Sequence, residues 1–379
     1  MLVILVIAAL FLAYWNGAND NFKGVATLYG SGTVNYRTAI TIATIATLAG
    51  SICAIFLAQG LVARFSGKGL VPESTAGGIE FLMAVGFGAA LTVLLATRLG
   101  YPISTTHSLV GGLMGAGLMA IGGDVDFKML GSTFFLPLIA SPFIALLLGA
   151  SVYWVFTHTR KTLGLTKESC ICVGEQREYV PLTTLAQGDT AATAMNIGLE
   201  NIAPPKLAVA VANTSECVDL YTDRVWGVHL QMLLDIAHGI SAALVSFARG
   251  LNDTPKIAGL LVAAQAFDIK WGMVAIAVGI ALGGLLNARR VAETISNKIT
   301  DLNHGQGFSA NLVTGILVIF ASNLGLPVST THVSVGSIFG IGMGTGKRNT
   351  KVIGNILISW IITLPVAMAL SALAYLLLA

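Results

Sequence analysis

Two runs of hydroxyl-bearing residues are the first candidates for chemistry in this chain. Pro102-Ile103-Ser104-Thr105-Thr106-His107 returns 225 positions later as Pro327-Val328-Ser329-Thr330-Thr331-His332, and seven of ten positions agree between 102–111 and 327–336. Each run precedes an apolar segment, and proline with Ser or Thr favours a helix start. Free N–H groups and hydroxyls at a helix start can bind an anion without a buried full charge. The predicted anion ligands are Ser104, Thr105, Thr106, Ser329, Thr330 and Thr331.

The pairs Asn19-Asp20 and Asn252-Asp253 are a second repeated set, 233 positions apart. Each pair lies in an otherwise apolar segment, where an ionised carboxylate costs at least ~2.5–3.5 kcal/mol. Amide and carboxylate oxygens, with carbonyls released from an interrupted helix, could form a cage for a hard cation such as Na⁺. Two alternatives stay open: a proton-carrying carboxylate, or an aspartate neutralised by Lys23 or Lys256, three residues further on.

Composition places these residues in a membrane protein. The 379 residues are 55% apolar and 10% charged, with a mean hydropathy of +0.81, whereas soluble domains carry about 25% charged residues. A lipid bilayer is therefore the expected surrounding. The net charge of +3 is too small to indicate a nucleic-acid partner, and no resident cofactor is expected.

Apolar runs of membrane-spanning length occur in two sets of five, because about 20 apolar residues cross a bilayer. They lie at about 2–29, 39–63, 80–97, 103–121 and 130–157, then at 226–267, 271–288, 309–324, 328–345 and 352–378. The first run of each set is interrupted, at 16–20 and at 249–255. An odd number of crossings per set predicts two inverted repeats, 1–157 and 226–379, joined by a polar linker at 158–225.

The segments on either side of each hydroxyl run are short for a full crossing and almost directly joined. They predict two re-entrant helical hairpins that enter from opposite sides and bring the two helix starts face to face. The alternative is an ordinary capped turn at the membrane surface. The expected fold class is therefore an all-α polytopic membrane protein with two inverted-topology repeats, broken helices and two re-entrant hairpins.

Lysine and arginine placement predicts the orientation. With the N-terminus outside, thirteen basic residues fall in inside loops, against four outside, namely Arg64, Lys68, Lys128 and Lys270. Basic residues favour the cytoplasmic side. We therefore expect a multi-pass protein of the cell membrane (plasma or inner), with both termini outside and the linker 158–225 in the cytoplasm.

Enzymes and channels are the competing classes. Ser or Thr beside His resembles a nucleophilic site, but neighbours in a helix point to different faces, and no Gly-x-Ser-x-Gly, His-Glu-x-x-His or P-loop occurs. The duplication of the motifs also argues against an enzyme, because an active site needs only one copy of each catalytic group. A channel is harder to exclude, although paired anion and cation sites suit an occluding carrier better than an open pore.

These motifs resemble the signatures of the inorganic phosphate transporter (PiT) family, which has duplicated Gly-x-Asn-Asp and Pro-x-Ser-Thr-Thr-His segments around a hydrophilic loop. The resemblance covers nearly the whole chain and implies a symporter for inorganic phosphate, driven by a cation gradient through alternating access. It implies that residues 104–106 and 329–331 cradle phosphate, and that Asn19, Asp20, Asn252 and Asp253 are signature residues.

The signature departs from the usual Val-x-Asn-Ala continuation, because this chain reads Asn21-Phe22-Lys23-Gly24 and Thr254-Pro255-Lys256-Ile257. The two lysines could tune the ion sites or contact the anion. Members of the family use Na⁺ or H⁺; the oxygen-rich Asn-Asp pairs favour Na⁺, with H⁺ as the alternative. Some relatives carry sulfate, so sulfate is the alternative anion. Small-residue helix faces are compatible with a homodimer.

Overall fold

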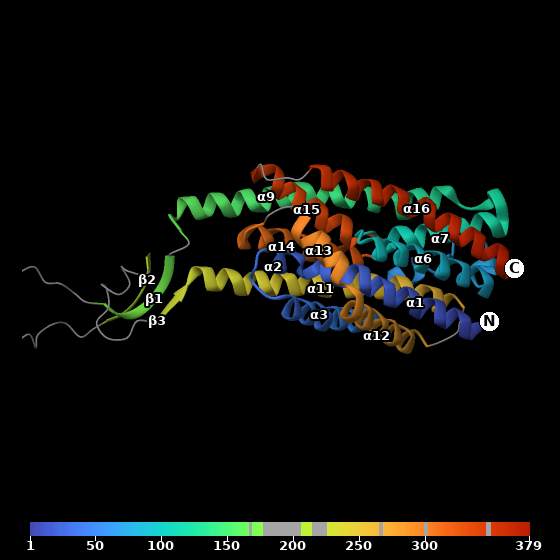
Figure 1. Cartoon of the computed structure of the whole chain (residues 1–379), viewed down its shortest axis with the longest axis horizontal. Coiled ribbons are helices and arrows are strands. Elements are labelled where there is room, and N and C mark those ends of the chain that lie inside the picture. The colour runs from blue at the N-terminus through green and yellow to red at the C-terminus, as the bar shows by residue number, and fades with distance from the viewer. Residues whose placement is uncertain (167–168, 177–205, 214–225, 265–267, 299–301, 346–349) are drawn as a thin grey trace, which may run out of the picture. The chain divides into compact units, whose positions relative to one another are not determined.

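The computed structural model describes residues 1–166, 169–176, 206–213, 226–264, 268–298, 302–345 and 350–379. They form two compact units, 1–156 with 237–379, and 157–236. The first unit is a helical bundle (Figure 1). The second unit contains a β-sheet.

The helices of the first repeat are α1 (Leu2–Asp20), η1 (Asn21–Val25), α2 (Ala26–Gly30), α3 (Tyr36–Leu57), α4 (Gln59–Arg64), α5 (Glu73–Ala76), α6 (Ile79–Leu99), α7 (Thr105–Ile121), η2 (Gly122–Asp124), α8 (Phe127–Met129), η3 (Leu130–Phe135) and α9 (Leu136–Thr162). Those of the second repeat are α11 (Leu230–Ala263), α12 (Ile269–Asn287), α13 (Arg289–Lys298), α14 (His304–Asn323), α15 (Thr330–Thr345) and α16 (Thr350–Leu378). The strands are β1 (Ser169–Gln176), β2 (Lys206–Asn213) and β3 (Trp226–His229).

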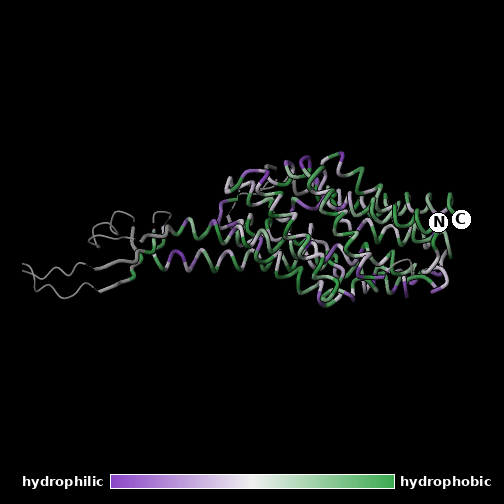
Figure 2. Tube along the Cα trace, turned by 90° about the horizontal axis from the view of Figure 1, so that it is seen from below, coloured by the Kyte–Doolittle hydropathy of each residue, from purple (hydrophilic) through white to green (hydrophobic). Residues whose placement is uncertain are grey.

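The bundle is built for a bilayer. Among the described residues, eight helical segments are long and apolar enough to cross a membrane. Large apolar side chains such as Phe56, Leu147 and Ile361 are exposed on its outer helices, and Figure 2 shows hydrophobic residues along much of the bundle. Exposing so much apolar surface to water is unfavourable, whereas the hydrocarbon core of a bilayer solvates it. The prediction of an all-α polytopic membrane protein is confirmed.

The two sets of helices repeat their contacts as well as their order. A Cβ on Gly17 in α1 would meet the Ile280 carbonyl in α12, and a Cβ on Gly250 in α11 would meet the Thr47 carbonyl in α3. These are corresponding contacts in the two sets, because Gly250 lies 233 positions after Gly17 and Ile280 lies 233 positions after Thr47. Glycine at these crossings lets the helix backbones touch. In Figure 1, α1 runs away from the end that carries the N-terminus and α11 runs toward it.

Small-residue faces on α7 and α15 are also used within the chain. Gly111 and Gly115 face the backbone of α16, and Gly336 and Gly340 face the backbone of α9. Close helix packing accounts for these glycines. The faces that made a homodimer attractive from the sequence are therefore occupied by helices of the same chain.

The helical hairpins α6–α7 and α14–α15 turn in the same way. Gly100 and Gly325 end the first helix of each hairpin with φ of 76° and 66°, a left-handed conformation that glycine adopts without strain. An extended stretch follows, and Ser104 and Ser329 then accept hydrogen bonds from the N–H groups of His107 and His332. The second helices have 17 and 16 residues, about 25 Å at 1.5 Å per residue, which is shorter than a ~30 Å hydrocarbon core.

The predicted interruptions are only partly present. Helix α1 continues through Asp20, and the break is the 3₁₀ segment η1 directly after it. The interruption predicted at 249–255 is wrong, because α11 is one continuous helix with Pro255 inside it. Proline is tolerated in membrane helices where neighbouring groups satisfy the freed backbone. The two repeats therefore differ at this point.

The linker is not simply a polar connection. Strands β1, β2 and β3 form an antiparallel sheet in the order β2-β1-β3. The apolar residues 207–212 of the linker belong to strand β2. Most of the predicted linker, 177–205 and 214–225, lies outside the described residues.

Candidate functional site

The tips of the two hairpins meet inside the bundle. The Thr106 hydroxyl donates to the Val328 carbonyl at 3.2 Å, and the Thr331 hydroxyl donates to the Ile103 carbonyl at 2.9 Å. These bonds are the same contact in the two repeats, since each partner lies 225 positions from its counterpart. The two carbonyls are available because they belong to the extended tips, outside any helical ladder. The helix starts of α7 and α15 thus face each other, as the sequence predicted.

Lys23 and Lys256 join the tips to the aspartates. Lys23 Nζ pairs with the Asp20 carboxylate and donates to the Ile103 carbonyl at 2.6 Å and the Thr331 hydroxyl at 2.7 Å. Lys256 Nζ lies 3.6 Å from Asp253 Oδ1 and donates to the Val328 carbonyl and the Thr106 hydroxyl, both at 2.7 Å. Each lysine therefore contacts a carbonyl in the hairpin of its own repeat and a threonine hydroxyl in the hairpin of the other repeat.

Asn16 connects the two carboxylates. Its amide nitrogen lies 3.2 Å from Asp20 Oδ2, 3.3 Å from Asp253 Oδ2 and 2.9 Å from the Thr105 hydroxyl. The Thr105 hydroxyl in turn donates to Asp20 Oδ2 at 3.2 Å. One amide within reach of both carboxylates gathers the charged residues of the two repeats into a single cluster.

The asparagines of the two signatures hold the hairpin tips. Asn19 donates to the Thr97 hydroxyl and the Tyr101 carbonyl and accepts from the Ile103 N–H. Asn252 donates to the Val328 carbonyl and accepts from the Ser322 hydroxyl. Asn252 also donates to Asp253 Oδ1 at 3.1 Å, so its amide joins the hairpin tip to the neighbouring aspartate. The cation-ligand role expected for Asn19 and Asn252 stays a prediction.

Arg249 occupies the position in α11 that Asn16 occupies in α1, at the offset of 233. Arg249 is 1% exposed, and its Nη2 donates to the Asn21 amide oxygen at 2.9 Å and the Thr47 hydroxyl at 3.0 Å. Nε and Nη1 are buried without a hydrogen-bond partner among the described residues. A buried cation with unused donors is costly unless anions lie nearby.

The six predicted anion ligands are all buried but have different partners. Ser104 and Ser329 are helix caps. Thr105, Thr106 and Thr331 belong to the hydrogen-bonded cluster described above, and the Thr330 hydroxyl has no hydrogen-bond partner in the described part of the chain. Sequence reasoning left Asn16 and Arg249 without a role, although the offset of 233 that relates the aspartates relates these two as well.

The source of the backbone oxygens also differs from expectation. Carbonyls were expected from helix interruptions beside the aspartates, and they come from the hairpin tips. The cage was predicted from Asn and Asp oxygens, whereas the oxygens observed at each lysine come from an aspartate, a tip carbonyl and a threonine hydroxyl. A lysine ammonium already lies among these oxygens. No cluster of three or more His, Cys, Asp or Glu residues of the kind that holds a metal ion occurs in the described ranges.

Apolar clusters border the polar residues both along α1 with η1 and along α11. Leu12 precedes Asn16 in one cluster, and Phe22 follows Asp20 in another. Along α11 the order reverses, with Ala242 in the second cluster and Leu251 in the first. Burial in apolar surroundings strengthens the attraction between the enclosed charges.

The two flanks of this polar layer differ. On the flank of α2, the Thr27 hydroxyl lies 3.1 Å from His238 Nε2 and 3.1 Å from the Asn311 amide oxygen. At the repeat-related positions stand Leu260, Leu5 and Gly86, and Gly86 packs directly against Leu260. One flank is therefore polar and the other apolar.

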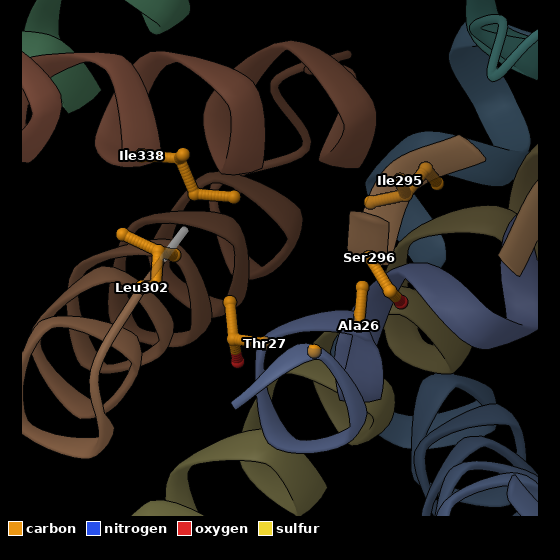
Figure 3. Close-up of a pocket in the computed structure, with 7 residues that line it drawn as sticks. Ala26, Thr27, Ile295, Ser296, Leu302 and Ile338 are labelled. Carbon is orange, nitrogen blue, oxygen red and sulfur yellow. The ribbon is translucent and has the colours of Figure 1, made fainter. Parts of the chain in front are cut away.

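Two cavities lie on the polar flank. Figure 3 shows the smaller one, about 10 Å³, between α2, α13, α15 and the segment before α14, with Thr27 and Ser296 on its wall; this is about the space of one water. The larger is an open groove of about 580 Å³ beside Gly100, lined in part by Arg98, Arg290 and Glu293. Its arginines favour anions.

An apolar helical bundle with buried polar residues at facing hairpin tips defines an integral membrane transporter rather than an enzyme. The sequence profile of the phosphate transporter family matches residues 16–371. The chain therefore belongs to the phosphate transporter family.

Relatives are similar over nearly their full length. A candidate phosphate permease of Haemophilus influenzae is 27% identical over an alignment of 402 residues, which covers 96% of this chain and 93% of the relative. A candidate phosphate permease of Pyrococcus abyssi is 27% identical, with coverage of 99% and 97%. A solved structure, the sodium-dependent phosphate transporter, has a TM-score of 0.75 and 25% identity, covering 100% of this chain and 98% of that one.

The pairing of Lys23 with Asp20 leads to a stability prediction. Lys23→Met leaves a buried carboxylate without its cation, and breaking a buried pair costs about 3–5 kcal/mol. The double variant Asp20→Asn with Lys23→Met should lose less stability than the two single changes together, because no unpaired charge remains. Unfolding of the purified protein in detergent measures the three variants, with exposed Lys128→Met as control. Lys23→Met as stable as the control would contradict the pairing.

Proposed function

We propose that this chain is a cation-coupled symporter of inorganic phosphate that works by alternating access. Residues 1–157 and 226–379 act as two inverted repeats, and α6–α7 and α14–α15 are re-entrant hairpins. The observation that carries the proposal is the meeting of two helix starts, one from each repeat, with buried lysines and threonines at the junction. Family membership and the named relatives support phosphate as the substrate.

Phosphate binds in this proposal at the junction of the tips. The hydroxyls of Thr105, Thr106, Thr330 and Thr331 donate to its oxygens, and the ammonium groups of Lys23 and Lys256 supply charge-assisted hydrogen bonds. The N-termini of α7 and α15 add the positive ends of two helix dipoles. Ser104 and Ser329 contribute as caps that fix those helix starts.

The crossed contacts at the hairpin tips support alternating access. Lys23 bonds the tip of its own repeat and Thr331 of the other, and Lys256 bonds its own tip and Thr106. A displacement of one repeat against the other therefore changes both sets of contacts together. Phosphate oxygens can replace the threonine contacts, so that binding and movement are coupled.

H⁺ is the coupling ion that the geometry favours, because each predicted cation cage already encloses a lysine ammonium. Na⁺ is the second candidate, supported by the name of the sodium-dependent structural relative and by the oxygen-rich signatures. Both ions would drive phosphate against its gradient. The proposed setting is the cell membrane, with the linker and the α13 side in the cytoplasm and the termini outside.

Uptake of labelled phosphate into proteoliposomes tests the function. An inward H⁺ gradient should accumulate phosphate uphill, whereas an inward Na⁺ gradient alone should not. The reverse result selects Na⁺ as the coupling ion.

Asp20→Asn and Asp253→Asn should each abolish coupled uptake, because each removes a charge from the cluster. Thr105→Ala and Thr330→Ala should chiefly raise the phosphate concentration required, because each removes one donor.

Two results would contradict this function. Uptake that ignores both gradients and never exceeds equilibrium would indicate a channel. If unlabelled sulfate inhibits the uptake of labelled phosphate more strongly than unlabelled phosphate does, sulfate is the substrate. Exposed Lys128→Asn is the matched control for the loss of a charged side chain, because Lys128 lies on the surface of α8.

We further propose that phosphate leaves on the flank of Thr27, His238 and α13. Both cavities described above lie there, and the repeat-related flank is packed with apolar side chains. Waters and anions move along polar walls more readily than through a packed apolar layer.

Cysteine accessibility tests this route. In a background with the four native cysteines replaced by serine, Thr27→Cys should react with a small anionic thiol reagent faster than Leu260→Cys, its repeat-related control. Phosphate should slow the reaction at Thr27 because it occupies the same path. Equal rates at the two positions would contradict the proposed route.

A further inference from the structure

The residues around Lys23 and Lys256 do not fit a free Na⁺ in the positions that the signatures suggest. An ammonium has three N–H donors. Lys23 Nζ has three oxygen partners, from Asp20, Ile103 and Thr331. These are a carboxylate, a carbonyl and a hydroxyl, the set that a hard cation would take.

The second repeat has the same arrangement. Lys256 Nζ donates to Val328 and Thr106 at 2.7 Å and lies 3.6 Å from Asp253. Lys23 and Lys256 are 4% and 1% exposed, so water contributes little to their solvation. The oxygens of each cage therefore solvate the ammonium that the chain itself provides, and a Na⁺ at either place would have to displace a buried lysine from all its partners.

The charges of the cluster point the same way. Asp20 pairs with Lys23, Asp253 lies beside Lys256, and Arg249 donates to Asn21, the neighbour of Asp20. With all five ionised, the cationic side chains of this buried region exceed the anionic ones by one. Arg249 keeps Nε and Nη1 without hydrogen-bond partners among the described residues. A cluster with surplus positive charge accommodates an anion, whereas a further cation adds repulsion.

We propose that Lys23 and Lys256 are tethered cations that replace bound Na⁺ in both cages, so that phosphate binds at the hairpin tips without Na⁺. The inference rests on the proposed function for the identity of the anion. It assigns the two departures from the family signature a specific role: they supply, as part of the chain, the positive charge that would otherwise come from a co-bound ion.

Equilibrium binding of labelled phosphate to the purified full-length protein tests this directly. The dissociation constant is measured in sodium chloride and in choline chloride at equal ionic strength and pH. Allosteric coupling between two ligands typically changes affinity about 5–150-fold. We expect the phosphate dissociation constants in the two salts to agree within about twofold, well below that range.

Variants of the lysines provide the second arm. Lys23→Asn with Lys256→Asn restores an amide at both signature positions and removes both tethered cations. Phosphate binding by this double variant should be weak in choline and strengthen at least about fivefold in Na⁺. The matched control, Lys128→Asn with Lys270→Asn, changes two exposed lysines and should behave like the unchanged protein.

The outcomes separate the inference from the function beneath it. Binding by the unchanged protein that strengthens about fivefold or more in Na⁺ overturns the tethered-cation inference and leaves phosphate transport intact. Absence of phosphate binding in both salts overturns the proposed substrate and the inference with it. Equal binding in both salts supports both, whether or not the double variant folds.

Discussion

The crossed hydrogen bonds at the hairpin tips are the contacts on which the rest of the bundle depends. Each buried lysine must reach an aspartate one turn away, a carbonyl of its own tip and a hydroxyl of the opposite tip. The left-handed glycines that end α6 and α14, the serine caps of α7 and α15, and the signature asparagines all hold the tips where those bonds can form. Glycines at the crossings of α1 with α12 and of α11 with α3 let these helices pack closely around the tips.

Electrostatics explains why these groups occur together. A buried ion is expensive alone, and breaking a buried pair costs about 3–5 kcal/mol, so the lysines, aspartates and Arg249 need one another. At an effective dielectric constant of about 20, a Na⁺ placed ~4 Å from either ammonium would add about 4 kcal/mol of repulsion. An anion at the same place would gain a similar attraction. The same charges that destabilise an added cation therefore favour phosphate.

Much of this arrangement could be predicted from residue spacing. The 225-residue and 233-residue offsets predicted the repeated helix order, the helix starts after Pro102 and Pro327, and the meeting of the tips. The continuous helix α11 could not be predicted, because tertiary packing decides whether Pro255 breaks a helix. The tip partners of Lys23 and Lys256 lie 72 or more residues away in sequence, and spacing alone gives no distance between distant segments. The strands of the linker were missed because their apolar pattern is short.

The central claim is that phosphate binds between the two tips with protein lysines as its cations. A structure determined with arsenate in sodium-free buffer tests this most directly, because the arsenic position can be located by anomalous scattering. We predict the anion between the starts of α7 and α15, within hydrogen-bond distance of the ammonium groups of Lys23 and Lys256. Arsenate bound away from both lysines, or bound there only when Na⁺ is added and the lysines are displaced, would contradict it.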